Sequence, residues 1–320
     1  MLVFGFAASG IALSQKPTDV RRFFYEGNGK LNLVCPKNGI SFNGRFRKGK
    51  GIYDEKALDK IYRLFGGEND KPDSHISLRL IEFLDYLEDT FKPGAKIIIA
   101  SGYRSPEYNT DLRNKGRLAA KASLHQYGMA ADINIQGTSS KRVWNIIKKL
   151  GFGGTGYYHG KLVHVDVGPA RFWDEKTSGV GTDISTHNKL IGIVTDYDIY
   201  LPGDRIALRF IRMTSFPVGV SPEFVLEKVE KNSQLTEITR FKPAFAITAV
   251  SECPHFSDIG QMMGIDWQLP TDIPSGRYKI RASFCQKVWK DMPARIFTPE
   301  FAVSRPASKK LTPASVYRVP

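Results

Sequence analysis

Two histidines and two aspartates in the middle of the chain have the residue types and spacing of a metal site. His125 lies at a turn, and Asp132 follows seven residues later on an apolar segment. In the segment 163–167, His164 and Asp166 alternate with valines, so a strand would direct both polar side chains to one face. Two imidazoles and a carboxylate on adjacent strands are the usual protein ligands of a catalytic zinc ion. Such an ion lowers the pKa of a bound water to about 7 and polarises a scissile carbonyl group.

Each histidine–aspartate pair also has a simpler explanation. A histidine and an aspartate two or seven residues apart often form a structural hydrogen bond, with no metal involved. The zinc hypothesis therefore requires that the two segments lie next to each other in the fold.

The periodicity of apolar residues predicts the helices and strands that would position this site. Segments 53–65 and 76–91 each place apolar side chains on one helical stripe. Segment 96–100 (KIIIA) is a short apolar run between Pro-Gly and Ser-Gly pairs, which predicts a buried strand. Helices and strands interleave without a regular βαβ rhythm, which indicates an α+β fold. The other predicted elements are a helix from Pro106 through Leu112, a strand at 129–135, a helix at 139–150 and a strand at 162–167.

After about residue 178 the chain changes to short β-rich runs separated by turn signals such as Pro202-Gly203-Asp204. This spacing predicts an antiparallel β-sandwich. The runs are 190–200, 205–212, 224–229, 244–250, 277–284 and 297–303. The predicted organisation is a leader at 1–14, an α+β domain at 15–178, the all-β sandwich at 179–304 and a loose tail at 305–320.

Composition excludes several classes of protein. The 320 residues are 42% hydrophobic and 24% charged, which rules out a disordered chain, a collagen-like repeat and a coiled coil. Lys+Arg 46 against Asp+Glu 32 gives a net charge of +14, which favours polyanionic surroundings such as cell-wall polymer, a membrane surface or nucleic acid. A nucleic-acid partner has no support beyond this charge, because no cysteine pair has zinc-finger spacing.

The first residues and the cysteines bear on the compartment. The opening MLVFGFAASGIAL is apolar and uncharged, too short for a membrane span of about 20 residues, and is typical of a signal-peptide core without its basic start. A buried N-terminal strand is the alternative. Cys253 and Cys285 could pair in an oxidising compartment or simply be buried, and Cys35 is left over. We expect export to the periplasm or cell envelope, with no transmembrane span.

Four separate blocks, in order and spacing, resemble one known family. This is the YcbK-like murein endopeptidase branch of the D-alanyl-D-alanine metallopeptidases, the hedgehog-like zinc peptidases that cut peptidoglycan peptides. The resemblance covers about residues 24–178, and none is recognised for 179–320. The blocks are SGYRSP (101–106), SLHQYGMAAD (123–132), GGTGYY (153–158) and VHVDVGPARFW (163–173).

The resemblance implies a hedgehog-like zinc domain and assigns roles to its residues. Arg104 would bind a substrate carboxylate or stabilise the oxyanion, which suits its fixed charge and planar fork. Ser123 would hold the loop or contact the substrate. Arg171 and Trp173 are expected to pack beneath the site. The implied zinc ligands are His125, Asp132 and His164.

The general base is less clearly indicated. Relatives often place a Glu or Asp three residues before the last ligand, or a His two before it, but these positions are Lys161 and Leu162. Asp166 is the predicted base, since it shares a strand face with His164. It could instead hold a ligand imidazole. His159, in a glycine-rich loop, is the second candidate for the base.

These observations predict an exported zinc peptidase that hydrolyses peptidoglycan stems or cross-links, as a murein endopeptidase or a D,D-carboxypeptidase. The sandwich would dock to the wall or to a protein partner, a role inferred only from its position and class. The alternative is a catalytically silent, zinc-containing wall-binding protein of the same fold, because hedgehog proteins share the metal site and are known for binding.

Overall fold

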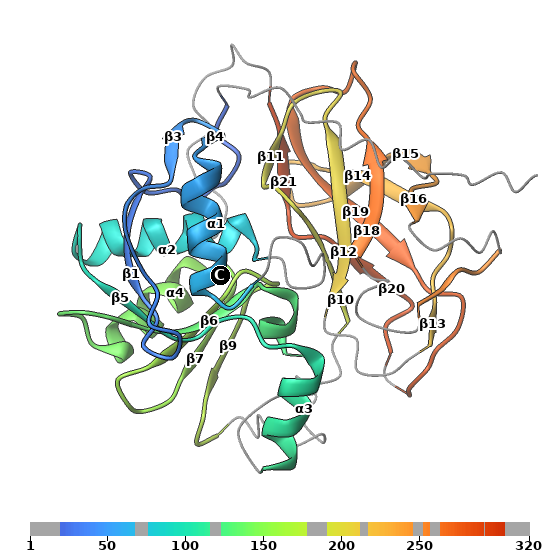
Figure 1. The fold of residues 1–320 in the computed structure, drawn as a ribbon. Helices are drawn as coiled ribbons and strands as arrows, with labels where there is room; N and C mark the ends of the chain where they lie inside the picture. Colours follow the sequence, from blue (N-terminus) through green and yellow to red (C-terminus); the bar gives the residue numbers. More distant parts are fainter. Residues whose placement is uncertain are drawn as a thin grey trace, which may run out of the picture.

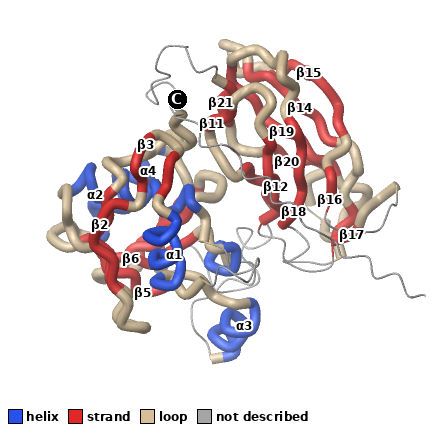
Figure 2. Tube along the Cα trace, turned by 45° about the horizontal axis from the view of Figure 1, so that its top comes forward, coloured by secondary structure: helices blue, strands red, loops and turns tan. Residues whose placement is uncertain are grey.

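The computed structural model describes residues 20–67, 76–115, 123–177, 191–211, 217–245, 252–256, 263–290 and 292–304. The N-terminal part (20–177) mixes helices and strands, and the C-terminal part (191–304) is built from strands (Figure 1). Figure 2 shows that the described helices all lie in the N-terminal part. The predicted leader and tail lie outside the described residues. Among those residues, no helix has the length and apolar character that crossing a membrane requires.

A seven-stranded mixed sheet forms the centre of the N-terminal part, in the order β2-β1-β5-β6-β8-β7-β9. Antiparallel pairing of β6 with β8 places Asp132 directly opposite His164, as the zinc hypothesis requires. A separate hairpin pairs β3 (Arg47–Gly49) with β4 (Ile52–Tyr53). The seven strands are β1 (Lys30–Val34), β2 (Ser41–Arg45), β5 (Ile97–Ser101), β6 (Ala130–Ile135), β7 (Gly154–Tyr157), β8 (Val163–Asp166) and β9 (Arg171–Asp174).

Two helices of the N-terminal part begin at residues whose side chains cap them. Asp54 caps the first helix by accepting a hydrogen bond from the Ala57 amide, and Ser139 caps the fourth in the same way. The fourth helix packs against β7 and β8. All four helices predicted from the sequence are confirmed. They are α1 (Glu55–Leu64), α2 (Leu78–Phe91), α3 (Pro106–Asn114) and α4 (Ser140–Leu150).

The C-terminal part contains a four-stranded sheet, β10-β12-β18-β16, and a six-stranded sheet, β11-β21-β19-β14-β15 with β20 beside β19. Aromatic rings connect the two sheets. Phe210 of β12 lies 6.3 Å from Phe224 of β14, and Trp267 of β18 stacks on Phe241 of β15 at 3.7 Å. The strands are β10 (Gly192–Thr195), β11 (Ile199–Tyr200), β12 (Arg205–Ile211), β14 (Phe224–Val229), β15 (Leu235–Phe241), β16 (Ala244–Phe245), β18 (Met263–Gln268), β19 (Gly276–Ser283), β20 (Arg295–Phe297) and β21 (Phe301–Val303), with β13 (Val218–Gly219) and β17 (His255–Phe256) forming a further pair.

Each β-rich run predicted after residue 178 contains at least one observed strand. The run at 244–250 is described only as far as Phe245. Cys253 and Cys285 form a disulfide, and Cys35 is free and buried. The pairing fits an oxidising compartment.

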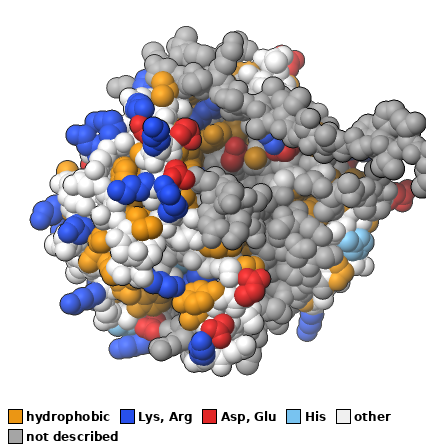
Figure 3. Space-filling model, viewed as in Figure 1, with side chains coloured by type: hydrophobic (Ala, Val, Ile, Leu, Met, Phe, Trp, Pro, Cys, Tyr) orange, Lys and Arg blue, Asp and Glu red, His pale blue; other side chains and the backbone are white. Residues whose placement is uncertain are grey.

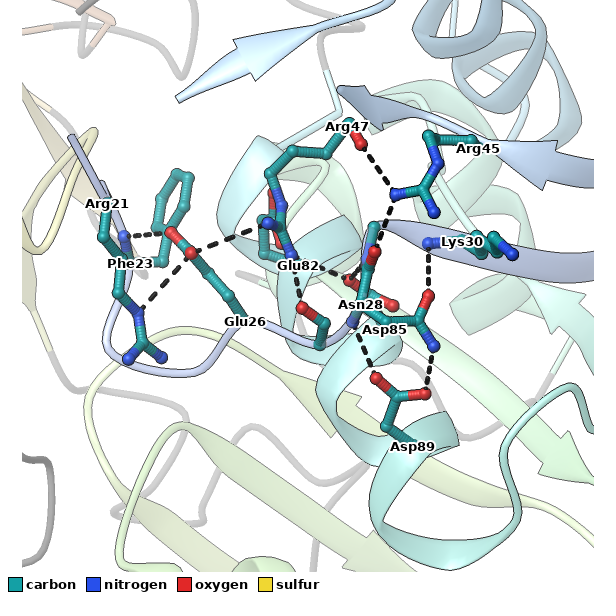
Figure 4. Close-up of polar contacts among 12 residues, drawn as sticks. Arg21, Phe23, Glu26, Asn28, Lys30, Arg45, Arg47, Glu82, Asp85 and Asp89 are labelled. Carbon is teal, nitrogen blue, oxygen red and sulfur yellow. Dashed lines mark hydrogen bonds and ion pairs between the residues drawn. The ribbon is translucent and has the colours of Figure 1, made fainter. Parts of the chain in front are cut away.

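A buried ionic cluster fixes the start of the N-terminal part on α2 (Figure 4). The Arg47 guanidinium lies 2.9 Å from Oε1 of Glu82 and 3.3 Å from Oδ2 of Asp85, and it donates to the Gly27 carbonyl at 2.5 Å. The side chains of Glu82 and Asp85 are fully buried. Together with Glu26, they make three carboxylates that pair with Arg47. Ionising all three in this setting is costly.

We expect Glu82→Gln to raise the melting temperature at pH 8.5 by about 2–5 °C and to change it little at pH 5. Burial raises the pKa of Glu82 to about 8, and Arg47 offsets this effect only in part. A carboxyl group with a raised folded-state pKa loses stabilising free energy as pH rises from about 4.5 through 8, and glutamine removes this loss. Thermal unfolding at both pH values tests this, with the exposed Glu237→Gln as control. Equal pH dependence in wild type and Glu82→Gln would refute it.

Candidate metal centre

Three buried side chains converge between β6, β8 and the short 3-10 turn η2 (Leu124–Tyr127). Nε2 of His125 lies 3.3 Å from Nδ1 of His164 and 3.5 Å from Oδ2 of Asp132. Nδ1 of His164 lies 3.1 Å from Oδ1 of Asp132. In a tetrahedral site with bonds of about 2.0–2.1 Å, ligand atoms lie about 3.3 Å apart. The two imidazoles are at this spacing, and each meets a different oxygen of Asp132. One ligand atom from each of the three residues lies within 4.8 Å of the others, and among the described residues they form the one group of this kind.

The η2 turn presents His125 with a defined orientation. The Ser123 hydroxyl accepts a hydrogen bond from the His125 amide, and Gly128 ends the turn with φ +61°, a left-handed conformation that glycine adopts without strain. Nδ1 of His125 lies 2.7 Å from the Gly102 carbonyl, which fixes the proton on that nitrogen. Nε2 is therefore the atom left facing His164 and Asp132. Of its two predicted roles, Ser123 occupies the position that holds the loop.

Asp166 lies on the other side of the His164 ring. Its Oδ2 is 3.1 Å from Nε2 of His164, whereas His125 and Asp132 face Nδ1. The same oxygen accepts a hydrogen bond from Arg171 at 2.9 Å, and Oδ1 accepts one from the Gly168 amide at 3.0 Å. The carboxylate is fully buried and has these partners on both oxygens. This placement argues against the predicted role of Asp166 as general base and favours the alternative, in which it orients a ligand imidazole.

Two hydrogen-bond donors flank the Asp132 carboxylate. Nη2 of Arg104 lies 2.7 Å from Oδ2, and the hydroxyl of Tyr158 donates to Oδ1 at 3.0 Å. Ser101 accepts a hydrogen bond from Nε of Arg104 at 2.9 Å, so the guanidinium is held in place with further N–H donors available. Arg104 thus lies at the site as predicted. Tyr158 is a site residue to which the sequence analysis assigned no role.

Comparison with known proteins places this site in a family. The Peptidase_M15_2 family, described as peptidoglycan L,D-endopeptidase MepK, matches residues 27–173. The MepK proteins of Escherichia coli (strain K12) and Shigella flexneri are each 32% identical over 144 residues, which is 45% of this chain and 79% of theirs. The chain belongs to this family. The resemblance to the YcbK-like branch is therefore confirmed.

The region shared with Peptidase_M15_2 contains the three converging side chains, and it ends before the C-terminal part. Among solved structures, a chain from a study of toxic shock syndrome toxin-1 covers 36% of this chain at 9% identity with a TM-score of 0.23, which is too low to indicate a shared fold.

The electrostatics of the site suit cation binding. Burial and the nearby Arg104 lower the pKa of His125 to about 4, so its imidazole is neutral at physiological pH. Burial opposes ionisation of Asp132, but its interactions with His125 and His164 hold its pKa well below the usual range. For His164, hydrogen bonds to Asp132 and Asp166 outweigh burial and raise the pKa. A cation and a proton therefore compete for Nδ1 of His164.

Glycines in β7 make room for the layer beneath the site. A Cβ atom on Gly156 would lie 2.3 Å from the Trp173 ring, and one on Gly154 would lie 2.1 Å from Oδ2 of Asp166. The Trp173 ring packs 4.7 Å from the His164 ring, and Arg171 lies over Trp173 at 4.3 Å. This glycine-rich strand lets the tryptophan and the carboxylate approach the ligand histidine closely.

His159, the second candidate for the general base, is directed away from the converging ligands. It follows β7 with φ +58°, and its Nε2 lies 2.6 Å from Oδ1 of Asp174 at the end of β9. Its side chain is 32% exposed, whereas the three converging side chains are buried. The preceding residue, Tyr158, reaches the site instead. Its position in the matched block GGTGYY was the available signal in the sequence.

Proposed function

We propose that the chain is a zinc-dependent peptidoglycan peptidase of the L,D-endopeptidase type. The observation that carries the proposal is the convergence of His125, Asp132 and His164, with one ligand atom from each within 4.8 Å of the others, inside the region shared with MepK. The names of the relatives favour a bond between an L- and a D-configured residue over the D,D bond that a carboxypeptidase would cut. The donor set, two imidazoles and one carboxylate, is suited to zinc, which would have to displace a proton from His164.

The residues around the ligands have separate tasks. When bound, zinc would supply a Lewis acid and lower the pKa of a coordinated water. Arg104 and Tyr158 present N–H and O–H donors beside the carboxylate ligand, where they can stabilise negative charge that develops on the substrate oxygen. Burial and the Asp132 charge raise the pKa of Tyr158 well above its usual value, so it acts as a donor and not as a base. Asp166 keeps His164 oriented through its Nε2.

The surroundings of the site are consistent with work on the cell wall. The net charge of +14 favours an anionic polymer, and Figure 3 shows many Lys and Arg side chains over the N-terminal part. The Cys253–Cys285 disulfide supports an exported location. We also propose that the two contacting sheets of the C-terminal part form the predicted β-sandwich. Its docking role remains a prediction.

Digestion of isolated sacculi and of defined muropeptides tests the function. We expect loss of species joined by L,D bonds, abolished by a chelator and restored by zinc, with muropeptides that contain only D,D bonds left intact. Chromatography and mass spectrometry identify the products. Release of free D-Ala would instead indicate a carboxypeptidase. Tight zinc binding with no cleavage of any substrate would refute the peptidase and favour the wall-binding alternative.

A further inference from the structure

The C-terminal part makes direct contact with the turn that carries His125. Nη1 of Arg209, on β12, donates a hydrogen bond to the carbonyl of Tyr127 at 3.1 Å. Tyr127 is the last residue of η2, two positions after His125. Carbonyl groups at the end of a helical turn have no partner inside the turn, so an arginine from another part of the chain can supply one. Burial and nearby Arg79 lower the pKa of Arg209 to about 10, which leaves it charged at neutral pH.

Other contacts hold different points of the same turn. The His125 carbonyl accepts from the Arg104 amide at 3.2 Å, and the Gly128 carbonyl accepts from the Ser77 amide, at the start of α2, at 2.9 Å. Arg209 donates to the Tyr127 carbonyl, which lies between the His125 and Gly128 carbonyl groups in the sequence. A hydrogen bond from a charged donor is stronger than one between neutral groups. Its loss would remove one of the contacts that hold the C-terminal end of η2.

Buried polar contacts fix β12 relative to the N-terminal part. Nε of Arg79, on α2, lies 2.8 Å from Oδ1 of Asp198, and its Nη2 donates to the Thr195 hydroxyl at 3.2 Å. Asp198 also accepts a hydrogen bond from the Phe24 amide at 3.1 Å. These residues are buried, and Thr195 lies on β10, which pairs with β12. The strand that carries Arg209 is therefore anchored independently of the η2 turn.

Gly168, just after β8, lies near both the turn and the end of β12. A Cβ atom on Gly168 would lie 2.7 Å from Leu124 of η2 and 3.7 Å from Ile211 at the end of β12. The absence of a side chain at Gly168 leaves room for both residues. The direct contact of the C-terminal part with η2 is the Arg209 hydrogen bond.

We propose that Arg209 is a positioning residue of the metal centre, which holds the Tyr127 carbonyl so that His125 keeps its ligand geometry. The C-terminal part then completes the site in addition to any docking role. This inference deepens the proposed function, because it takes the three converging side chains as a zinc site. The inference predicts that changing Arg209 alters the mobility of the η2 turn, and this can be measured whether or not the protein hydrolyses a substrate.

The test compares Arg209→Met, Arg209→Lys and Arg205→Ala in the full chain. Methionine keeps the apolar stem without the donors, and lysine restores one charged donor. Arg205 is an exposed residue of the same strand, 54% accessible and paired with Asp266, and serves as the control. We expect Arg209→Met to bind zinc about tenfold more weakly in a chelator competition. Lysine should recover most of this loss, and Arg205→Ala should behave as wild type.

Hydrogen exchange of the metal-free protein provides a second readout. Arg209→Met should speed exchange of the amides in 124–129, while the melting temperature shows that the chain is folded. If the methionine variant does not fold, Arg209→Gln, which keeps a neutral donor, takes its place. Wild-type zinc affinity together with unchanged exchange would overturn the proposal, as would equal losses in Arg205→Ala. Faster exchange of the 124–129 amides in Arg209→Met, together with no cleavage by the wild type, would refute the peptidase function and leave the role of Arg209 standing.

Discussion

Replacing Asp132 with asparagine is expected to weaken zinc binding by about 10²–10³-fold and to reduce hydrolysis below detection. Asp132 is the only anionic member of the three converging side chains, and its carboxylate receives hydrogen bonds from Arg104 and Tyr158. An amide keeps the shape of the side chain but is a poor zinc ligand, so one of three protein ligands is lost. Zinc affinity measured by chelator competition, together with turnover of muropeptides, checks this expectation.

The control for Asp132→Asn is Asp111→Asn, which alters an exposed carboxylate on α3 that pairs with Lys115. It should retain both zinc binding and turnover. His125→Ala should lose zinc in the same way as Asp132→Asn, because Nε2 of His125 faces the same point. One-to-one zinc bound with wild-type affinity in either ligand variant would remove that residue from the ligand set.

Asp166→Asn is expected to weaken zinc binding by about 10–100-fold, with turnover recovering at saturating zinc. The carboxylate of Asp166 accepts a hydrogen bond from Nε2 of His164, and in the neutral imidazole this favours the tautomer whose Nδ1 can bind a cation. An asparagine can turn its NH₂ group towards Nε2, which favours the tautomer that cannot bind the metal through Nδ1. Turnover measured over a series of zinc concentrations separates this effect from a direct role in catalysis.

The control here is Asp174→Asn, which removes the partner of His159 and should leave zinc affinity and turnover unchanged. If Asp166 were the general base, Asp166→Asn would bind zinc as wild type does and stay inactive at saturating zinc. A large loss of turnover in Asp174→Asn would restore His159 as a candidate.

Much of the N-terminal fold could be predicted because its elements have strong local patterns. Helices α1, α2 and α4 each carry a repeating apolar stripe, β5 is a continuous apolar run, and β6 and β8 alternate apolar with polar residues. The strands that were not predicted are β1 to β4, β7 and β9 in the N-terminal part and β13, β15, β17 and β18 in the C-terminal part. The glycines of β7 are explained by Trp173 and Asp166, which lie in other strands, and most of β15 faces solvent. The residue types in these strands are set by side chains that are distant in sequence or by solvent, so local periodicity does not predict the strands.

The sequence by itself determined which three side chains to expect together. Residue type, strand alternation and the family motifs can all be read from short stretches of chain. Only the tertiary structure shows how the other residues lie around them, and the proposed roles rest on these positions. The role of Asp166 depends on which nitrogen of His164 it meets, and the φ of +58° at His159 helps leave Tyr158 as the neighbour of Asp132. Arg209 reaches the His125 turn from 82 positions along the chain. Contacts between distant segments follow from packing and leave no periodic signal in sequence.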